Sequence, residues 1–336
     1  MNKIVTIRDI ASHLSISVST VSRALRGSYD VSPETRERVK EAARTLQYHP
    51  NYHARALARR SSYTIGIILP YITNYYFAAV LTGIEEYASR HGYHVTLFMT
   101  QDNPATEKIF LQQLSPYRLD GLLACTSLDN SEGMAYTRLL AMGLPVVFFD
   151  RALGSVLASR VLQDDVAGAR LAVTHLIESG YRNIAHITGA VNNLMTSRRL
   201  QGYLQALEEA GLQQTNEWVI HSGFDVESGY NDTGRLLDSA NQPDAIFSVN
   251  DRKAFGCLQQ LRERKITAGS QFGLVGFTNE PSASYVFPRL TSVEEPAMEI
   301  GSESCEILLK HIHNKWKHAE ERILPGRLCI RESSHR

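Results

Sequence analysis

The chain has 336 residues, 35 Lys and Arg against 35 Asp and Glu, and 43% hydrophobic residues. This length predicts two or three domains, and the apolar fraction is enough for buried cores, which excludes a wholly disordered chain. No apolar run approaches the roughly 20 residues needed to cross a bilayer, and we expect no signal peptide. The cysteines show no CxxC spacing, so neither a disulfide framework nor a metal knuckle is expected, and a reducing cytoplasm fits best.

The balanced net charge hides an asymmetry along the chain. Residues 1–60 carry 11 Lys and Arg against 5 Asp and Glu, a net charge of +6, whereas the remainder carries −6. A basic head on an acidic body predicts a module for binding polyanions joined to a second domain. A surplus of six charges also occurs on ordinary solvated surfaces, so this signal is weak by itself.

The first fifty residues predict short helices joined by tight turns. Apolar side chains at helical spacing indicate helices over 7–14 and 18–25, capped by Thr6 and Ser17, and Pro33 begins a third helix. The outward side chains of the second helix are small or polar and include arginine: Val18, Ser19, Ser22, Arg23 and Arg26. This pattern predicts a helix-turn-helix that enters the major groove of DNA. On pattern alone, a three-helix bundle with a polar face remains an equal alternative.

The residue strings themselves favour DNA binding. Thr6–Ala11, Ser17–Leu25 and Val31–Arg36 resemble the headpiece of the lactose and galactose repressor (LacI/GalR) family. Tyr48–Asn51, followed by Ala54–Leu57, resembles the hinge helix of that family. The resemblance covers essentially the whole chain, and it implies a transcriptional regulator, most simply a repressor, that binds double-stranded operator DNA.

The resemblance also implies which residues contact DNA. On the second helix, Val18, Ser19 and Arg23 match base-reading positions, and Thr20 and Ser22 match positions that contact phosphates or bases. Asn51, Ala54 and Leu57 match hinge positions that enter the minor groove. The expected set is Thr6, Val18, Ser19, Thr20, Ser22, Arg23, Asn51, Ala54, Arg55 and Leu57. Leu57 corresponds to a leucine wedge that unstacks a base step. Without the resemblance, packing of this leucine against the third helix or the body is the favoured interpretation.

Residues 61–336 alternate apolar runs with amphipathic stretches of helical length. The expected strands are 64–69, 94–99, 121–126, 146–149, 184–188, 219–222, 245–249 and 274–277. Such alternation predicts an α/β body of two doubly wound parallel-sheet subdomains with a cleft at the carboxyl ends of their strands. The resemblance implies the periplasmic-binding-protein-like fold.

These patterns divide the chain into a headpiece, a hinge and a body. We expect a helix-turn-helix headpiece over 1–50, a hinge helix over 51–60, and an effector-binding and dimerisation domain over 61–336. The expected N-subdomain spans about 61–162 and 292–323, and the C-subdomain about 163–291 and 324–336. A homodimer is expected because one headpiece reads too few bases for a specific operator.

The sequence contains no motif that we would assign to catalysis. It has no GxxxxGK[ST] loop, no GxSxG elbow and no HExxH pair. Pro50 separates His49 from His53, which argues against a helical metal pair. Asp164-Asp165 is more simply the start of a helix than a catalytic pair. We therefore expect no enzymatic activity, no cofactor and no metal.

Polar and aromatic residues at the expected strand ends predict a small-molecule site, and the resemblance assigns them to an effector. Aromatic faces beneath a sugar, with Asn, Asp and Arg around its hydroxyls, suit carbohydrate binding. The expected set is Asn74, Tyr76, Phe77, Asp150, Arg151, Arg199, Phe224, Asn250, Asp251 and Thr278. The alternative is that the two consecutive aromatics only pack in the core and that Asp251 only caps its helix.

One departure from the family leaves the charge of the effector open. Thr278 stands where relatives usually have aspartate, so the usual charged contact to a sugar is in doubt. Either Arg151 and Arg199 favour an anionic sugar, or Asp150 or Asp251 replaces the carboxylate and the sugar is neutral. A purine-type co-repressor and a sugar-binding protein without a transcriptional role are further alternatives.

Overall fold

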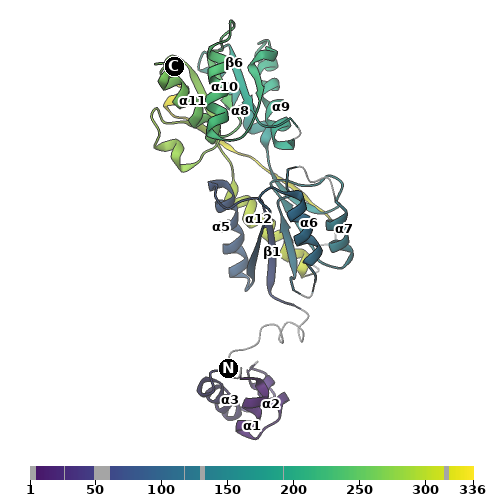
Figure 1. Ribbon diagram of the computed structural model, residues 1–336. Coiled ribbons are helices and arrows are strands. Elements are labelled where there is room, and N and C mark those ends of the chain that lie inside the picture. Colours follow the sequence, from purple (N-terminus) through teal and green to yellow (C-terminus); the bar gives the residue numbers. More distant parts are fainter. Residues whose placement is uncertain are drawn as a thin grey trace. The chain divides into compact units, whose positions relative to one another are not determined.

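The computed structural model describes residues 5–25, 27–48, 61–116, 118–128, 133–191, 193–313 and 318–336. The chain divides into two compact units, Met1–Ser62 and Tyr63–Arg336 (Figure 1). The predicted hinge residues Asn51, Ala54, Arg55 and Leu57 lie outside the described residues, so their assignment stays a prediction.

Three helices form the described part of the first unit: α1 (Ile7–Leu14), α2 (Val18–Leu25) and α3 (Pro33–Thr45). Their apolar stripes meet in one small core of Ile10, Ala11, Val21, Ala24, Val31, Val39 and Ala42. Ser15 adopts a left-handed conformation (φ 53°) and starts the tight turn between α1 and α2. This arrangement confirms the predicted helix-turn-helix.

Short polar contacts fix where these helices begin. The Thr6 N–H and hydroxyl both donate to the Asp9 carboxylate, at 2.8 and 2.6 Å. The Ser17 hydroxyl accepts from the Thr20 N–H at 3.0 Å, so the turn residue caps α2 as predicted. These caps orient α2 with its polar face outward, because its apolar stripe is taken up by the core.

The second unit contains two sheets, of which the first has the strand order β11-β5-β4-β3-β1-β2 and is parallel throughout. Helices α5 and α12 cover one face of this sheet, and α6 and α7 cover the other (Figure 1). The strands are β1 (Thr64–Leu69), β2 (His94–Met99), β3 (Gly121–Ala124), β4 (Val146–Phe149), β5 (Ser159–Gln163) and β11 (Glu321–Leu324). The helices are α5 (Tyr75–Arg90), α6 (Pro104–Gln113), α7 (Met134–Ala141) and α12 (Ala297–Ile312).

The second sheet has the order β12-β10-β9-β8-β6-β7, with β12 antiparallel to β10 and the other pairs parallel. Helices α8 and α9 pack on one face, and α10 and α11 on the other. The strands are β6 (Ile184–Thr188), β7 (Val219–His221), β8 (Ala245–Ser248), β9 (Gly273–Thr278), β10 (Thr291–Glu294) and β12 (Arg327–Cys329). The helices are α8 (Asp165–Glu178), α9 (Leu194–Glu209), α10 (Val226–Leu237) and α11 (Asp251–Glu263), and the short 3₁₀ turns are Asn216–Trp218, Pro281–Ser284 and Glu332–Ser334.

The chain passes from one sheet to the other after β5, after β10 and between β11 and β12. The predicted boundary at 292 is wrong, because β10 pairs with β9 from Thr291 to Glu294 and so belongs to the second sheet. The crossing therefore lies just beyond Glu294. With this correction, the structure has the two doubly wound subdomains that the sequence predicts.

Candidate functional site

The outer face of α2 carries the side chains predicted to read DNA. Val18, Ser19 and Arg23 are exposed, and Thr20 and Ser22 are half-buried, whereas Val21 and Ala24 lie in the core. The Ser17 hydroxyl lies 2.7 Å from that of Ser19 and 2.8 Å from that of Thr20, which orders the amino-terminal turn of the helix. Thr6 is exposed, with its hydroxyl bound to Asp9. The predicted headpiece residues that the structure describes thus include a contiguous set on one exposed helix.

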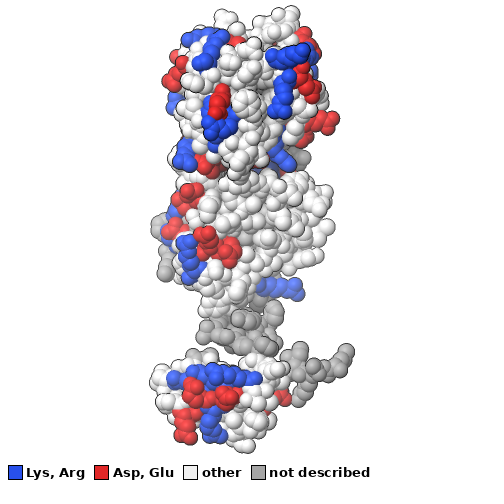
Figure 2. Space-filling view, turned by 90° about the vertical axis from the view of Figure 1, so that its left-hand side faces the viewer, with Lys and Arg blue, Asp and Glu red and all other residues white. Residues whose placement is uncertain are grey.

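The basic surplus of the headpiece does not form an unbroken patch on every face. Figure 2 shows a face of the first unit on which Lys and Arg are interspersed with Asp and Glu. Within α3, Glu37 pairs with Lys40 at 2.8 Å and Glu41 with Arg44 at 3.6 Å. Part of the charge on α3 is therefore balanced locally, and on α2 Arg23 is likewise paired, with Asp30 at 3.0 Å.

In the body, the first wall of the predicted effector site comes from the start of α5. Asn74 caps this helix, because its Oδ1 accepts from the Phe77 N–H at 2.9 Å. Tyr76 and Phe77 are buried edge to face, with ring centroids 5.2 Å apart. Burial and the negative charge of Asp150 raise the pKa of Tyr76 well above its ordinary value. Both rings belong to the hydrophobic core, and Tyr76 also lines a cavity.

The end of β4 adds an acid and a base to this wall. Asp150 has a left-handed backbone (φ 59°), and its Oδ2 accepts from the Cys125 thiol at 3.4 Å. Arg151 donates to Oδ1 of Asp102 at 2.7 Å, and the same oxygen accepts from the Leu128 N–H at 3.0 Å. Asp102 therefore neutralises Arg151. Sequence reasoning missed this partner, because 49 residues separate the two in the chain.

Arg199 lies at the centre of the second wall and is only 2% exposed. Its guanidinium donates to Asp165 and Glu295, at 2.8 Å each, and to the Val249 carbonyl at 2.6 Å. Its Cζ atom also lies 3.5 Å from the centroid of the Phe277 ring. Burial raises the pKa of Glu295 to about 7 although Arg199 opposes that rise. Two carboxylates thus share one buried cation, and one of them, Glu295, also lines the cavity.

Thr278 ends β9 and lines the same cavity as Tyr76 and Glu295. Glu295, from the segment that follows β10, thus brings a carboxylate to the cavity that Thr278 also lines.

Asp251 does not face the cleft, which corrects its assignment as an effector contact. It is fully buried, and its carboxylate accepts from the Ser292 hydroxyl at 2.6 Å and from the Glu280 N–H at 2.7 Å. Burial raises the pKa of Asp251 to about 7. Its predicted role as the helix cap is also wrong, because Asn250 is the N-cap of α11. Asp251 instead ties α11 to β10 and to the loop after β9.

Asn250 and Phe224 lie next to each other, and the contact between them is made to the backbone of Phe224. Asn250 Nδ2 donates to the Phe224 carbonyl at 3.0 Å, while its Oδ1 accepts from the Lys253 N–H at 2.8 Å. The Phe224 ring packs against Gly189 so closely that a Cβ there would lie 2.2 Å from it. Asn250 therefore positions the loop that carries Phe224.

A buried lysine that sequence reasoning missed supports this loop from beneath. Lys253 has no exposed surface, and its Nζ donates to Asp232 at 2.8 Å, Ser222 at 2.7 Å and the Thr188 carbonyl at 2.9 Å. The sequence offers one signal for it, a lysine inside the apolar stripe of α11. The contact fixes the ends of β6 and β7 next to Phe224.

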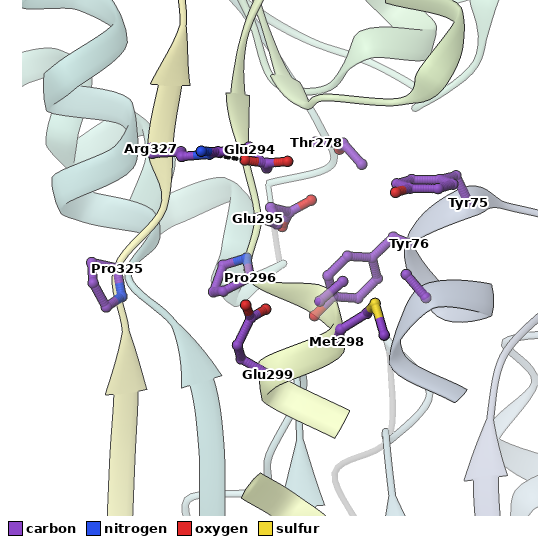
Figure 3. A pocket seen from close by; sticks show the side chains of 12 residues that line it. Tyr75, Tyr76, Thr278, Glu294, Glu295, Pro296, Met298, Glu299, Pro325 and Arg327 are labelled. Carbon is purple, nitrogen blue, oxygen red and sulfur yellow. Dashed lines mark hydrogen bonds and ion pairs between the residues drawn. The ribbon is translucent and has the colours of Figure 1, made fainter. Parts of the chain in front are cut away.

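A cavity of about 470 Å³ opens between the start of α5 and the segments that join the two sheets. Figure 3 shows Tyr75 and Tyr76 on one side of it, and on the other Glu294, which is ion-paired with Arg327. Glu295 lies between them. Of the predicted effector residues, Tyr76 and Thr278 line this cavity. The charged groups at its wall are mostly carboxylates, in contrast to the cationic pocket considered from the sequence.

Within the part of the chain that the structure describes, no group of three or more His, Cys, Asp or Glu side chains could hold a metal ion. The described helices include none that is long and apolar enough to cross a membrane.

The fold and site define a two-part regulator, with a helix-turn-helix unit and a two-lobed body built around a cleft. Residues 6–51 match the model of the bacterial regulatory proteins, lacI family, and residues 173–334 match the periplasmic binding protein-like domain. The chain is 32% identical to the ribose operon repressor of Haemophilus influenzae, over 98% of both chains. It is 30% identical to the transcriptional repressor PurR of Aliivibrio salmonicida, over 98% of this chain and 99% of that protein.

A solved structure of the lac repressor dimer, bound to operator and an anti-inducer, has the same fold, with a TM-score of 0.88. It is 24% identical and covers 99% of this chain and 100% of that one. The chain belongs to the LacI family and is a DNA-binding transcriptional repressor of that family, which is not a family of enzymes.

Proposed function

We propose that this protein is a cytoplasmic, homodimeric repressor whose operator affinity is controlled by a neutral, polyhydroxylated effector, a sugar or sugar derivative. In this proposal residues 1–50 read the operator, 51–60 form the hinge helix, and 61–336 bind the effector and dimerise. The observation that carries the neutral effector is the pairing of Arg199 with both Asp165 and Glu295.

Carboxylates around the cleft argue against an anionic effector. Arg151 is paired with Asp102 and Arg199 with two acids, so neither arginine offers an uncompensated positive charge. A phosphate or uronate would have to displace a buried carboxylate or lie beside it, and both cost free energy. Hydroxyl groups instead donate readily to carboxylates such as Asp150 and Glu295. Tyr76 supplies the aromatic face that a sugar ring packs on.

The name of the ribose operon repressor supports a sugar, and the name of PurR keeps a purine base as the competing outcome. A purine base is flat, and its hydrogen-bond donors are a small number of N–H groups. The carboxylates near the cleft accept hydrogen bonds. A sugar, with many hydroxyl donors, can satisfy more of them than a purine base, with few N–H donors, and this favours the sugar.

Exposed apolar side chains on the first-sheet subdomain support the homodimer. Leu97 and Met99 on the edge strand β2 are 41% and 46% exposed. Figure 2 shows a broad area of this subdomain without Lys, Arg, Asp or Glu. Exposed edge strands with apolar side chains are usually covered by a partner. A second copy of the chain would bury them and place two headpieces on one operator.

Calorimetric titration of the full chain tests the effector. Neutral pentoses, hexoses and disaccharides are compared with their phosphorylated counterparts and with purine bases, and every binder is then tested for its effect on operator affinity. We expect a neutral sugar to bind at least tenfold more tightly than its phosphate. Tighter binding of a sugar phosphate or of a purine would refute the neutral-sugar proposal and leave the repressor assignment intact.

A further inference from the structure

Arg23, the outward arginine of α2, is held by an acid from the loop that follows its own helix. Its Nη1 donates to Oδ2 of Asp30 at 3.0 Å, with 52% of the arginine side chain and 39% of the aspartate side chain exposed. Gly27 turns the chain in a left-handed conformation (φ 73°), and the Ser28 N–H donates to the Arg23 carbonyl at 3.0 Å. This turn returns Asp30 to the last turn of α2.

The loop that carries Asp30 is anchored from α3 and from the core. Arg36 Nη2 donates to the Ser28 carbonyl at 2.9 Å, and Val31 is buried among the helices. Hydrogen bonding from the Ser28 side chain and the charge of Arg23 hold the pKa of Asp30 below its ordinary value. A chain of contacts from α3 therefore places an ionised carboxylate beside the arginine.

We propose that Asp30 sets the sequence selectivity of the headpiece by holding the Arg23 guanidinium in one orientation toward the base edges. This inference rests on the proposed base-reading role of Arg23. A guanidinium carries five N–H donors in a fixed fork, and two of them match the O6 and N7 acceptors of guanine. An unrestrained arginine also binds phosphates, which are present in every sequence.

The carboxylate of Asp30 acts on both kinds of contact. By accepting from Nη1 it limits rotation of the guanidinium and leaves the other donors free for a base. Its negative charge also disfavours the approach of a phosphate to the same place. An exposed ion pair adds little to folding stability, so the headpiece should stay folded without it. Asp30 is thus a positioning residue, which contributes to choice of sequence more than to affinity.

The test uses the full chain and an operator selected from a randomised palindromic duplex library. Competition binding is measured against that operator with each base pair substituted in turn, and against duplex of random sequence. The variants are Arg23→Ala, Asp30→Asn, the combination of these two, Asp30→Glu, and Glu41→Gln. Glu41→Gln removes the same charge from the headpiece, but the partner of Glu41 is Arg44 on its own helix.

We expect Asp30→Asn to bind random duplex about threefold more tightly, since it removes one negative charge from the interface. We also expect it to lose about tenfold of discrimination at one base pair of each half-site, the pair at which Arg23→Ala loses discrimination. Glu41→Gln should raise affinity for every sequence and leave discrimination unchanged. Asp30→Glu keeps the carboxylate and should restore discrimination to within about threefold of the natural protein.

The outcomes separate the two claims. If Arg23→Ala leaves discrimination unchanged at every position, Arg23 does not read bases, and both claims fail. If Arg23→Ala loses discrimination among bases at one operator position but Asp30→Asn keeps it there, only the positioning role of Asp30 is overturned. A loss of discrimination by Asp30→Asn that persists in the Arg23→Ala background would overturn it as well, because Asp30 would then act without the arginine. Circular dichroism melting checks that each variant is folded.

Discussion

Arg199 and Glu295 form a buried ion pair at 2.8 Å that joins α9 to the segment following β10. The same guanidinium binds Asp165, the first residue of α8 after the chain has left the first sheet. One side chain of the second-sheet subdomain thus holds two of the segments that run between the sheets. An effector that alters this pairing acts where the two subdomains are joined, which is where hinge closure is controlled.

Replacing Arg199 by alanine should therefore damage both folding and the response to effector. Asp165 and Glu295 would be left buried without their cation, which costs about 3–5 kcal/mol of the free energy of unfolding. Urea denaturation measures this loss, and calorimetry measures effector binding at a temperature where the variant is folded. We expect effector binding to be abolished while operator affinity without effector stays within a few-fold.

A matched variant separates the two effects. Arg199→Lys keeps a positive charge but cannot bind both acids and the Val249 carbonyl in the geometry of the guanidinium. We expect an intermediate stability and a weakened effector response. If effector changed the operator affinity of Arg199→Ala as much as that of the natural protein, the arginine would stabilise the fold without a role in regulation.

Lys253 gives a second prediction, because its ammonium group is fully buried against Asp232. Lys253→Met should lower the free energy of unfolding by about 3–5 kcal/mol, since it leaves the aspartate without its cation. Effector affinity should fall as well, because Ser222 and Thr188 lose the donor that holds them near Phe224.

The double variant Lys253→Met, Asp232→Asn is the control for the lysine. Removing both charges eliminates the unpaired ion, so we expect at least half of the lost stability to return in urea denaturation. If the single and double variants were equally unstable, lost packing of the lysine chain would be the cause, and the ion pair would contribute little.

Most of the fold follows from the sequence, because runs of apolar residues at strand length alternate with amphipathic runs at helix length. Four strands, β5, β10, β11 and β12, are missing from the strands expected from the sequence, and two of them, β5 and β11, show why. Their segments, Ser159–Gln163 and Glu321–Leu324, are short and carry arginine, glutamate or glutamine among few apolar residues. The place of β10 was also missed, because a short apolar strand gives no sign of which of two sheets it joins.

The candidate site was less predictable, because its charge depends on residues far apart in the chain. Arg199 was identified, but its partners Asp165 and Glu295 lie 34 and 96 residues away. The sequence alone therefore leaves the charge of the pocket open between a cationic site and one with a carboxylate. Asp251 was expected in the cleft because it follows a strand, yet its side chain turns toward β10, where the Ser292 hydroxyl and the Glu280 N–H satisfy it.

Asp251 predicts a stability that depends on pH. Its folded pKa of about 7 is raised above the ordinary 3.8, so between about pH 4 and pH 7 the folded protein holds a proton that the unfolded chain has released. The free energy of unfolding therefore falls as pH rises through this window, and levels off above it. Across this pH window Asp251 lowers the free energy of unfolding by on the order of 4 kcal/mol. Glu295, with a pKa of about 7, acts in the same direction.

The measurement compares variants, because other groups titrate too. Burial lowers the pKa of His186 from 6.5 to about 3, so between these pH values the unfolded chain binds a proton that the folded protein does not. The free energy of unfolding therefore rises with pH in this range, opposite to the effect of the two carboxyls. Asp251→Asn should flatten the fall in melting temperature between pH 5 and pH 8 relative to the natural protein. Asp238→Asn, at an exposed carboxyl paired with Arg264, should not. Parallel curves for the natural protein and Asp251→Asn would contradict the assigned pKa.

The hinge gives the last prediction, for a residue outside the described part of the structure. Leu57 matches the family position of a wedge that enters the minor groove, where unstacking a base step costs a few kcal/mol that the added contacts to bent DNA must offset. Leu57→Ala should lose operator affinity by about 10-fold or more and bend the operator less, while the melting temperature of the body is unchanged. Gel-shift titration and circular-permutation assays measure affinity and bending. Leu57→Met keeps a flexible apolar side chain of similar volume and should retain most of both. Wild-type bending by Leu57→Ala would show that this leucine packs against protein instead of DNA.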